Sequence, residues 1–280
     1  MIRLSVEADK NGLIALWQEA FGDCKEAIDM FLDSRYIPEN TVVAEDNGKI
    51  VSMLFLLEGK LKINESNFSS YYLYAAATAK SHRGRGFMPE LLSFSQNTAL
   101  SRGVDFICLK PADKSLYNYY SRFGYKSVFA FKRIKFNVLK VEFDHTDSSD
   151  IIDWSYVRNN SITQSNAFIW DNSAIDFAVR QHLYYNGNIL KNCNGYCLYY
   201  FENNVCNIKE FCFTDKLLPC VASQISAESS VADFIIDLPV DFRVNINGDI
   251  IQNGMALAVT ESAKSVFNDV KNAYLNLTLD

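Results

Sequence analysis

The stretch from Tyr72 to Phe87, YLYAAATAKSHRGRGF, decides the fold of the surrounding chain. Small and aromatic residues predict a strand, which runs into a basic turn and then into a helix from about residue 87 to 101. Gly84 and Gly86 allow a tight turn in which successive backbone N–H groups face one point. The first turn of the helix adds free N–H donors and the positive end of its dipole. With Arg83 and Arg85 nearby, this arrangement predicts a binding site for a pyrophosphate.

Two other phosphate-binding loops do not fit these residues. The P-loop needs G-x-x-x-x-G-K-[ST], which the chain lacks, and the dinucleotide fingerprint G-x-G-x-x-G would need a glycine where Pro89 stands. A proline is tolerated in the first turn of a helix, so Pro89 agrees with the predicted helix start. The alternative without a binding function is an ordinary strand-to-helix turn.

The elements around this loop predict an α/β or α+β domain with a mixed central sheet flanked by helices. Upstream, a helix is expected at residues 9–21, and Asn47-Gly48 marks a hairpin between strands at 41–45 and 50–57. A helix is also expected at 115–122, ending before Gly124. Further strands are expected at 60–63, 71–79, 104–109 and 127–136.

Arg83-Gly84-Arg85-Gly86-Phe87 resembles the R-G-x-G-hydrophobic signature of the GNAT family of N-acetyltransferases. The resemblance covers residues 1 to about 135. It implies the GNAT fold, acetyl-CoA as cosubstrate and direct acyl transfer without a covalent enzyme intermediate. It also implies that backbone amides of the loop hold the coenzyme A pyrophosphate, while the strand before it pairs with the pantetheine arm. The positions carried over are Ala76, Ala77, Thr78, Arg83, Gly84, Arg85, Gly86, Phe87 and Met88.

Residues 109–125 look like a second motif of the same family, in which Tyr120 is followed after three residues by Gly124-Tyr125. In the family the matching tyrosine protonates the departing coenzyme A thiolate, so the resemblance implies Tyr120 as the general acid. Tyr117 and Tyr119 are competing candidates on the same predicted helix. A packing role for Tyr120 is the alternative.

No motif identifies the base that would accept the amine proton. Glu58 and Glu90 are candidates, although either is also typical of a solvated carboxylate. Pro111-Ala112 together with Phe123-Gly124-Tyr125 is similar to the branch called enhanced intracellular survival proteins. In that branch the C-terminal carboxylate enters the active site as a base. The resemblance therefore implies Asp280 as a second catalytic residue, and the alternative is a solvated terminus.

The same branch has a second, degenerate GNAT-like domain. The second half of this chain shows a helix, a hairpin and further strands, and a polar, aperiodic stretch at 141–165 predicts the boundary. We expect a GNAT acetyl-CoA-binding domain at 1–140, a linker at 141–160 and a smaller GNAT-like α+β domain at 161–280. The alternating residues 274–279 predict a final strand. The chain lacks the third, sterol-carrier-like domain of longer members, so acetylation of an aminoglycoside at several sites is not expected.

Charge and hydrophobicity indicate which classes of binding partner to expect. The 280 residues include 33 acidic and 27 basic side chains, and the net charge of −6 argues against a nucleic-acid groove. No apolar run is long enough for a membrane span and no N-terminal signal is visible, so a cytoplasmic protein without membrane contact is expected. The expected acceptor is a primary amine of a small molecule or peptide, and a homo-oligomer is compatible with the sequence.

Metal and disulfide chemistry are not expected. The seven cysteines are irregularly spaced, and the three histidines have no partners at the spacing of metal ligands. We interpret the cysteines as small buried hydrophobic residues in a reducing compartment.

Two other functions remain as alternatives. Tandem GNAT-like folds also occur in transferases that take an aminoacyl group from tRNA, which would favour a basic surface and would not need the Arg-Gly-x-Gly loop. A module that binds coenzyme A or a partner protein as a sensor, without catalysis, would not need Tyr120.

Overall fold

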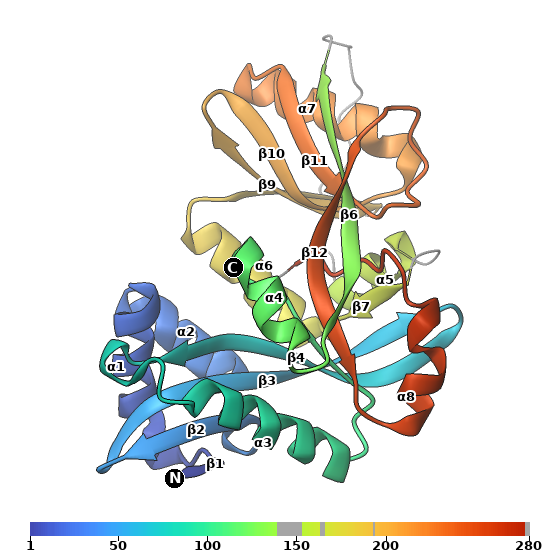
Figure 1. Cartoon of the computed structure of the whole chain (residues 1–280). Helices are drawn as coiled ribbons and strands as arrows, with labels where there is room; N and C mark the ends of the chain where they lie inside the picture. Colours follow the sequence, from blue (N-terminus) through green and yellow to red (C-terminus); the bar gives the residue numbers. More distant parts are fainter. Residues whose placement is uncertain (139–152, 163–165, 193, 278–280) are drawn as a thin grey trace. The chain divides into compact units, whose positions relative to one another are not determined.

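The computed structural model describes residues 1–138, 153–162, 166–192 and 194–277 (Figure 1). They divide into two compact units, each assembled from separate stretches of the chain. Unit 1 comprises residues 1–61, 66–127 and 254–269, and unit 2 comprises residues 62–65, 128–253 and 270–280. Residues 254–269, which we placed in the second domain from the sequence, therefore belong to unit 1. The two units are comparable in size.

Unit 1 contains a mixed sheet with the strand order β1-β2-β3-β4-β5-β12. The β4–β5 pair is parallel, whereas the β1–β2, β2–β3 and β5–β12 pairs are antiparallel. The strands are β1 (Ile2–Leu4), β2 (Thr41–Asp46), β3 (Lys49–Ile63), β4 (Ser66–Thr78), β5 (Phe106–Leu109) and β12 (Asp249–Ala258). The helices are α1 (Lys10–Phe21), α2 (Lys25–Arg35), α3 (Phe87–Ser101), α4 (Lys114–Ser121) and α8 (Glu261–Val266).

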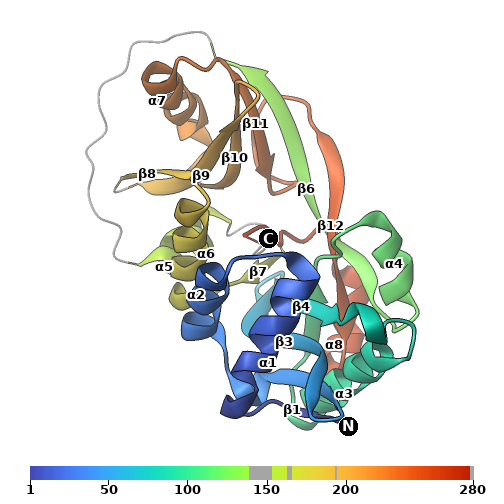
Figure 2. The ribbon, with the colours of Figure 1, turned by 90° about the vertical axis from the view of Figure 1, so that its left-hand side faces the viewer.

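Alternation along the strands sends successive side chains of this sheet to opposite faces. Phe55 of β3 meets Trp17 of α1 and Phe31 of α2, with ring centroids 5.6 and 5.0 Å apart. The neighbouring Leu54 belongs to a different buried cluster, which it shares with Leu91 of α3. Helices α1 and α2 therefore cover one face and α3 covers the other, as the two views show (Figures 1 and 2).

The strands of unit 2 follow the order β6-β11-β10-β9-β8 within the sheet. The β10–β11 pair is parallel, whereas the β8–β9, β9–β10 and β6–β11 pairs are antiparallel. The strands are β6 (Lys126–Asn137), β7 (Ala167–Ile169), β8 (Asn188–Asn192), β9 (Gly195–Glu202), β10 (Val205–Cys212) and β11 (Asp233–Leu238). The helices are α5 (Trp154–Ser161), α6 (Asn172–Tyr184) and α7 (Leu218–Ser229).

The core of unit 2 combines an apolar cluster with one buried ion pair. Val221 and Ile225 of α7 pack with Phe234 of β11, which holds α7 against the sheet (Figure 2). Arg158 of α5 and Glu210 of β10 are both fully buried, and Arg158 Nε donates to Glu210 Oε1 over 2.7 Å.

The expected class, α/β with a mixed sheet flanked by helices, is confirmed. Two local expectations are wrong. The strands expected at 50–57 and 60–63 form one continuous strand, β3. Of the strand expected at 274–279, residues 274–277 are described, and they form no strand beyond an isolated bridge at Tyr274. Leu277 has a φ of 60°, outside the extended region. Residues 278–280 lie outside the described residues. Within the described residues, no helix is long and apolar enough to cross a membrane.

Candidate functional site

The predicted loop leaves β4 after Thr78, passes through a short 3₁₀ turn at Lys80–His82 and enters α3 at Phe87. Gly84 and Gly86 have φ values of 75° and 88°, in the left-handed region that favours glycine. A Cβ on Gly86 would lie 3.9 Å from its nearest neighbour, and one on Gly84 would meet nothing within 4 Å. The backbone conformation of the loop, not crowding, therefore requires these glycines.

Gly86 is also the residue that caps the N-terminus of α3, and no side chain caps it. The N–H groups of the first turn of an α-helix have no partners within the helix. Here they are left beside the loop, at the positive end of the helix dipole. An anion fits this position better than any neutral group.

The two arginines of the loop contribute to its own conformation. Arg83 Nε donates to Thr78 O over 3.1 Å, which ties the turn to the end of β4. The Arg85 guanidinium lies over the Phe87 ring, 5.5 Å from its centroid, and 3.6 Å from Asp46 Oδ2. Because the Arg85 side chain is still 54% exposed, it keeps donors for a ligand.

Residues distant in the sequence support the loop. Glu19 Oε1 of α1 accepts a hydrogen bond from the Lys80 backbone N–H over 2.6 Å. Ser52 Oγ of β3 donates to Ala77 O over 2.8 Å and lies 2.8 Å from Thr78 Oγ1. Asp46 Oδ2 in turn lies 3.3 Å from His82 Nε2. No local sequence pattern marks Glu19, Asp46 or Ser52, because the partner of each lies tens of residues away.

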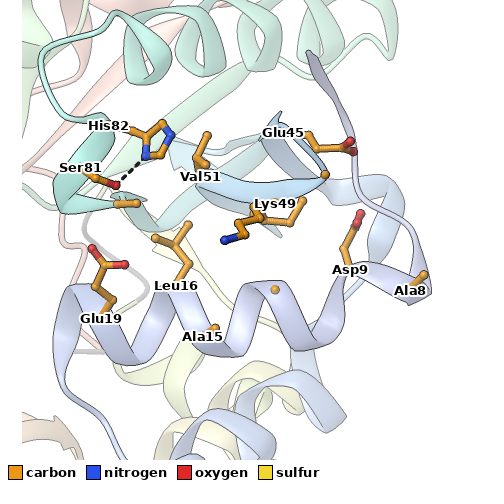
Figure 3. A pocket seen from close by; sticks show the side chains of 14 residues that line it. Ala8, Asp9, Ala15, Leu16, Glu19, Glu45, Lys49, Val51, Ser81 and His82 are labelled. Atoms are coloured by element: carbon orange, nitrogen blue, oxygen red, sulfur yellow. Dashed lines mark hydrogen bonds between the residues drawn. The ribbon is translucent and has the colours of Figure 1, made fainter.

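A cavity of about 520 Å³ adjoins the loop in unit 1 (Figure 3). It is bounded by α1, by the start of β3 and by Ser81 and His82, whose side chains lie 2.8 Å apart. Figure 3 shows Glu19 reaching from α1 towards Ser81 at one end of the cavity. Glu19 therefore connects the loop to α1 at the edge of a hollow, so the loop is held there by a polar contact.

A kink in β4 sets the direction of the strand residues before the loop. The register with β5 covers three pairs in the described residues and ends where Tyr72 faces Cys108. Ala75 then has a φ of 46°, which is unusual for a residue other than glycine. Strict alternation would send Leu73 and Ala76 to opposite faces, yet both contact the buried cluster under α3. The kink at Ala75 therefore turns the Ala76 side chain to the α3 side, beyond the part of β4 that pairs with β5.

Tyr120 lies near the end of α4, whose start is capped by Asp113 accepting from the backbone N–H groups of Ser115 and Leu116. The Tyr120 side chain is 8% exposed, and its ring lies 5.7 Å from that of Tyr125. Burial, with a smaller contribution from Tyr119, raises the pKa of Tyr120 to about 12. The phenol is thus protonated throughout the neutral range and can act only as a hydrogen-bond donor or a weak acid.

The structure brings Tyr120 and the loop into one cluster. Tyr120 is a buried member of the cluster under α3, and Ala76, Phe87 and Met88 pack against the same cluster. The competing residues Tyr117 and Tyr119 also border it, and burial raises the pKa of each. Of the two, Tyr119 is the direct neighbour of Tyr120, with ring centroids 5.3 Å apart.

Of the carboxylates considered as bases, two are exposed and the third lies outside the described residues. Glu58 is exposed and accepts a hydrogen bond from Asn40 Nδ2 over 3.0 Å. Glu90 is an exposed residue in the first turn of α3. Asp280 lies outside the described residues, so its position relative to the loop stays a prediction.

Four of the six cysteines among the described residues are buried. Cys108, Cys197, Cys206 and Cys212 are buried as expected, whereas Cys24 is exposed. In the parts of the chain that the structure describes, no group of three or more His, Cys, Asp or Glu side chains could hold a metal ion.

The first 128 residues match the family model described as acetyltransferase (GNAT) domain. This match includes the loop, α3 and the whole of α4. Residues 1–128 are therefore similar to a GNAT acetyltransferase domain, the domain of an acyltransferase. No curated protein sequence matches the chain.

Solved structures resemble nearly the whole chain. A GNAT acetyltransferase from Anabaena variabilis has a TM-score of 0.75 at 10% identity, over 94% of this chain and 74% of that chain. A probable N-acyltransferase from Enterococcus faecalis has a TM-score of 0.73 at 15% identity, over 92% and 72%. The Eis1 protein of Mycobacterium abscessus has a TM-score of 0.70 at 12% identity, over 92% and 74%. At these identities the likeness establishes the fold, and the expected GNAT fold is confirmed.

Proposed function

We propose that this protein is an N-acetyltransferase that moves the acetyl group of acetyl-CoA to a primary amine of a small molecule or peptide. The observation that carries the proposal is the loop between β4 and α3. Gly84 and Gly86 hold it in a left-handed conformation, and it ends at a helix N-terminus that no side chain caps. This geometry suits the pyrophosphate of coenzyme A. The match of residues 1–128 to the GNAT domain supports acyl transfer as the reaction.

The residues around the loop fit the rest of the cosubstrate. The backbone of residues 76–78 extends past the part of β4 that pairs with β5, so it offers hydrogen-bonding groups to an extended pantetheine arm. Arg85 is exposed enough to contact a phosphate. Tyr120 lies in the cluster against which Ala76 packs.

The proposed reaction forms one C–N bond and breaks one C–S bond. The amine nitrogen attacks the thioester carbonyl carbon and loses a proton to a base, a role for which Asp280 stays a prediction. The C–S bond then breaks, and its electron pair leaves on sulfur as the coenzyme A thiolate. Tyr120 donates its O–H to that thiolate. A thiol has a pKa near 8.5, and Tyr120 has one of about 12. Hydrogen-bond donation is therefore favourable, whereas complete proton transfer from Tyr120 is uphill.

Replacing Tyr120 with phenylalanine tests this role. Tyr120→Phe keeps the buried ring and removes the O–H, so kcat should fall by about a hundredfold to ten-thousandfold. The affinity for acetyl-CoA should change little, because the hydrogen bond strengthens only as the thiolate forms. Tyr119→Phe, in the adjoining ring, is the matched control and should stay near wild type. A Tyr120→Phe enzyme within threefold of wild type would assign Tyr120 to packing.

Binding and transfer measurements separate the alternatives. Calorimetry with acetyl-CoA, followed by a screen of primary amines for acetyl transfer, should give both binding and turnover if the proposal holds. Binding without transfer to any amine would favour the sensor. Transfer that requires aminoacyl-tRNA, with no binding of acetyl-CoA, would favour the tRNA-dependent transferase.

A further inference from the structure

Unit 2 contains a second cavity, of about 570 Å³, whose lining includes no residue of the loop or of α4. It is bounded by the end of β6, by the start of α7 and by residues 243–246. Its volume is within the range of roughly 300–1,000 Å³ that small-molecule sites occupy. Most of its wall is apolar, formed by Phe136, Val138, Leu218, Pro219, Val244 and Ile246.

Residues 243–246, which form one wall of this cavity, are held by contacts just before and just after them. Before the lining residues, the Phe242 carbonyl accepts a hydrogen bond from Lys132 Nζ over 2.9 Å, and the Phe242 ring lies 6.0 Å from that of Phe211. After them, Gly248 approaches β6 so closely that a Cβ would lie 2.6 Å from Arg133 O. Residues 243–246 therefore bridge two fixed points, and the cavity is a preformed part of the fold.

The charged side chains among the described lining residues of the cavity are all basic. Arg243 and Lys216 contribute basic groups, and no acidic side chain is among its described lining residues. This is notable in a chain with a net charge of −6. Ile246 is 37% exposed, so part of the apolar wall faces solvent. An apolar hollow beside basic groups is complementary to an anion that carries an alkyl chain.

We propose that this cavity binds a free fatty acid, with the alkyl chain against the apolar wall and the carboxylate beside Arg243. A fatty acid satisfies both features of the wall, since burying its methylenes is favourable and its charge is opposite to that of Arg243. The site is separate from the loop that we assign to acetyl-CoA, so its occupancy can be tested without reference to acetyl transfer.

Calorimetry on the whole chain with octanoate, decanoate and dodecanoate, each below its micelle concentration, tests the proposal. One molecule should bind per chain, with affinity rising by up to about fourfold for each added methylene. Dodecanol should bind more weakly than dodecanoate, and the cation dodecyltrimethylammonium more weakly still. No binding, or equal binding of the anion and the cation, would overturn the proposal.

Two substitutions at exposed positions locate the site. Arg243→Gln should weaken dodecanoate binding by about fivefold and leave dodecanol binding unchanged, as expected for loss of one exposed charge contact. Ile246→Glu places a negative charge in the wall and should abolish dodecanoate binding, while Lys264→Gln in unit 1 is the control for loss of a surface cation. Thermal unfolding identifies any variant that fails to fold. Self-association that Ile246→Glu removes, with dodecanoate not binding, would instead identify a second copy as the occupant and refute the fatty acid.

Discussion

Gly86→Ala isolates the conformational demand that the loop places on its backbone. Gly86 has a φ of 88°, and the Cβ of an alanine there would lie 3.9 Å from its nearest neighbour, Glu90 Oε1. The substitution therefore adds no clash and no charge. It changes only the energy of the left-handed conformation, which costs an ordinary L-residue about 1–2 kcal/mol.

This cost should appear as weaker cosubstrate binding. The free variant can relieve the strain by leaving the conformation that aims the backbone N–H groups at one point. Binding of acetyl-CoA must then restore that conformation at the same cost. The dissociation constant should accordingly rise by about 5-fold to 30-fold. Calorimetric titration with acetyl-CoA measures this change, and urea unfolding measures the accompanying loss of stability.

Gly103→Ala is a matched control, because Gly103 has a φ of 67° and nothing within 4 Å of its Cβ position. It lies after α3, outside the loop. Gly103→Ala should lose stability with its affinity for acetyl-CoA unchanged. Gly86→Ala should lose affinity, and its loss of stability should be smaller by the strain that the free variant relieves. If Gly86→Ala binds acetyl-CoA like wild type, or if Gly103→Ala weakens binding equally, the loop conformation is not what holds the pyrophosphate.

Three further outcomes are expected. Glu19→Ala should raise the KM for acetyl-CoA severalfold with kcat unchanged, since it leaves the Lys80 N–H without its acceptor, whereas Glu19→Gln should stay near wild type in steady-state kinetics. The Tyr120 pKa is raised from near 10 to about 12 on folding, so roughly 2–3 kcal/mol of stability present below pH 10 should be lost as the pH rises to 12. Unfolding free energies measured across that range should decline less for Tyr120→Phe. Arg158→Met should destabilise unit 2 by about 3–5 kcal/mol in urea because it leaves Glu210 buried and unpaired, and adding Glu210→Leu should recover much of that loss.

Short-range patterns determined the elements on which the proposed site depends. The sequence from Tyr72 to Phe87 predicts a strand, a turn and a helix, and all three are present with glycines at positive φ. Asp113 precedes the helix that carries Tyr120 and caps it as such residues do. These features follow from backbone sterics and hydrogen bonds within a few residues, so they can be recognised without knowing the rest of the fold.

Tertiary structure decided how these elements are supported and completed. Strand β12 pairs with β5 through Met255 and Leu109, a contact across more than half of the chain, and nothing near Met255 in the sequence indicates that partner. The kink at Ala75 cannot be predicted from the sequence either, because alanine has no local preference for a left-handed conformation. No local pattern predicts the hydrogen bond from the Lys80 N–H to Glu19 either, although it ties the loop to helix α1. Periodicity reports which face of an element is apolar, whereas pairing across the chain depends on the shape and burial of surfaces that only the folded protein brings together.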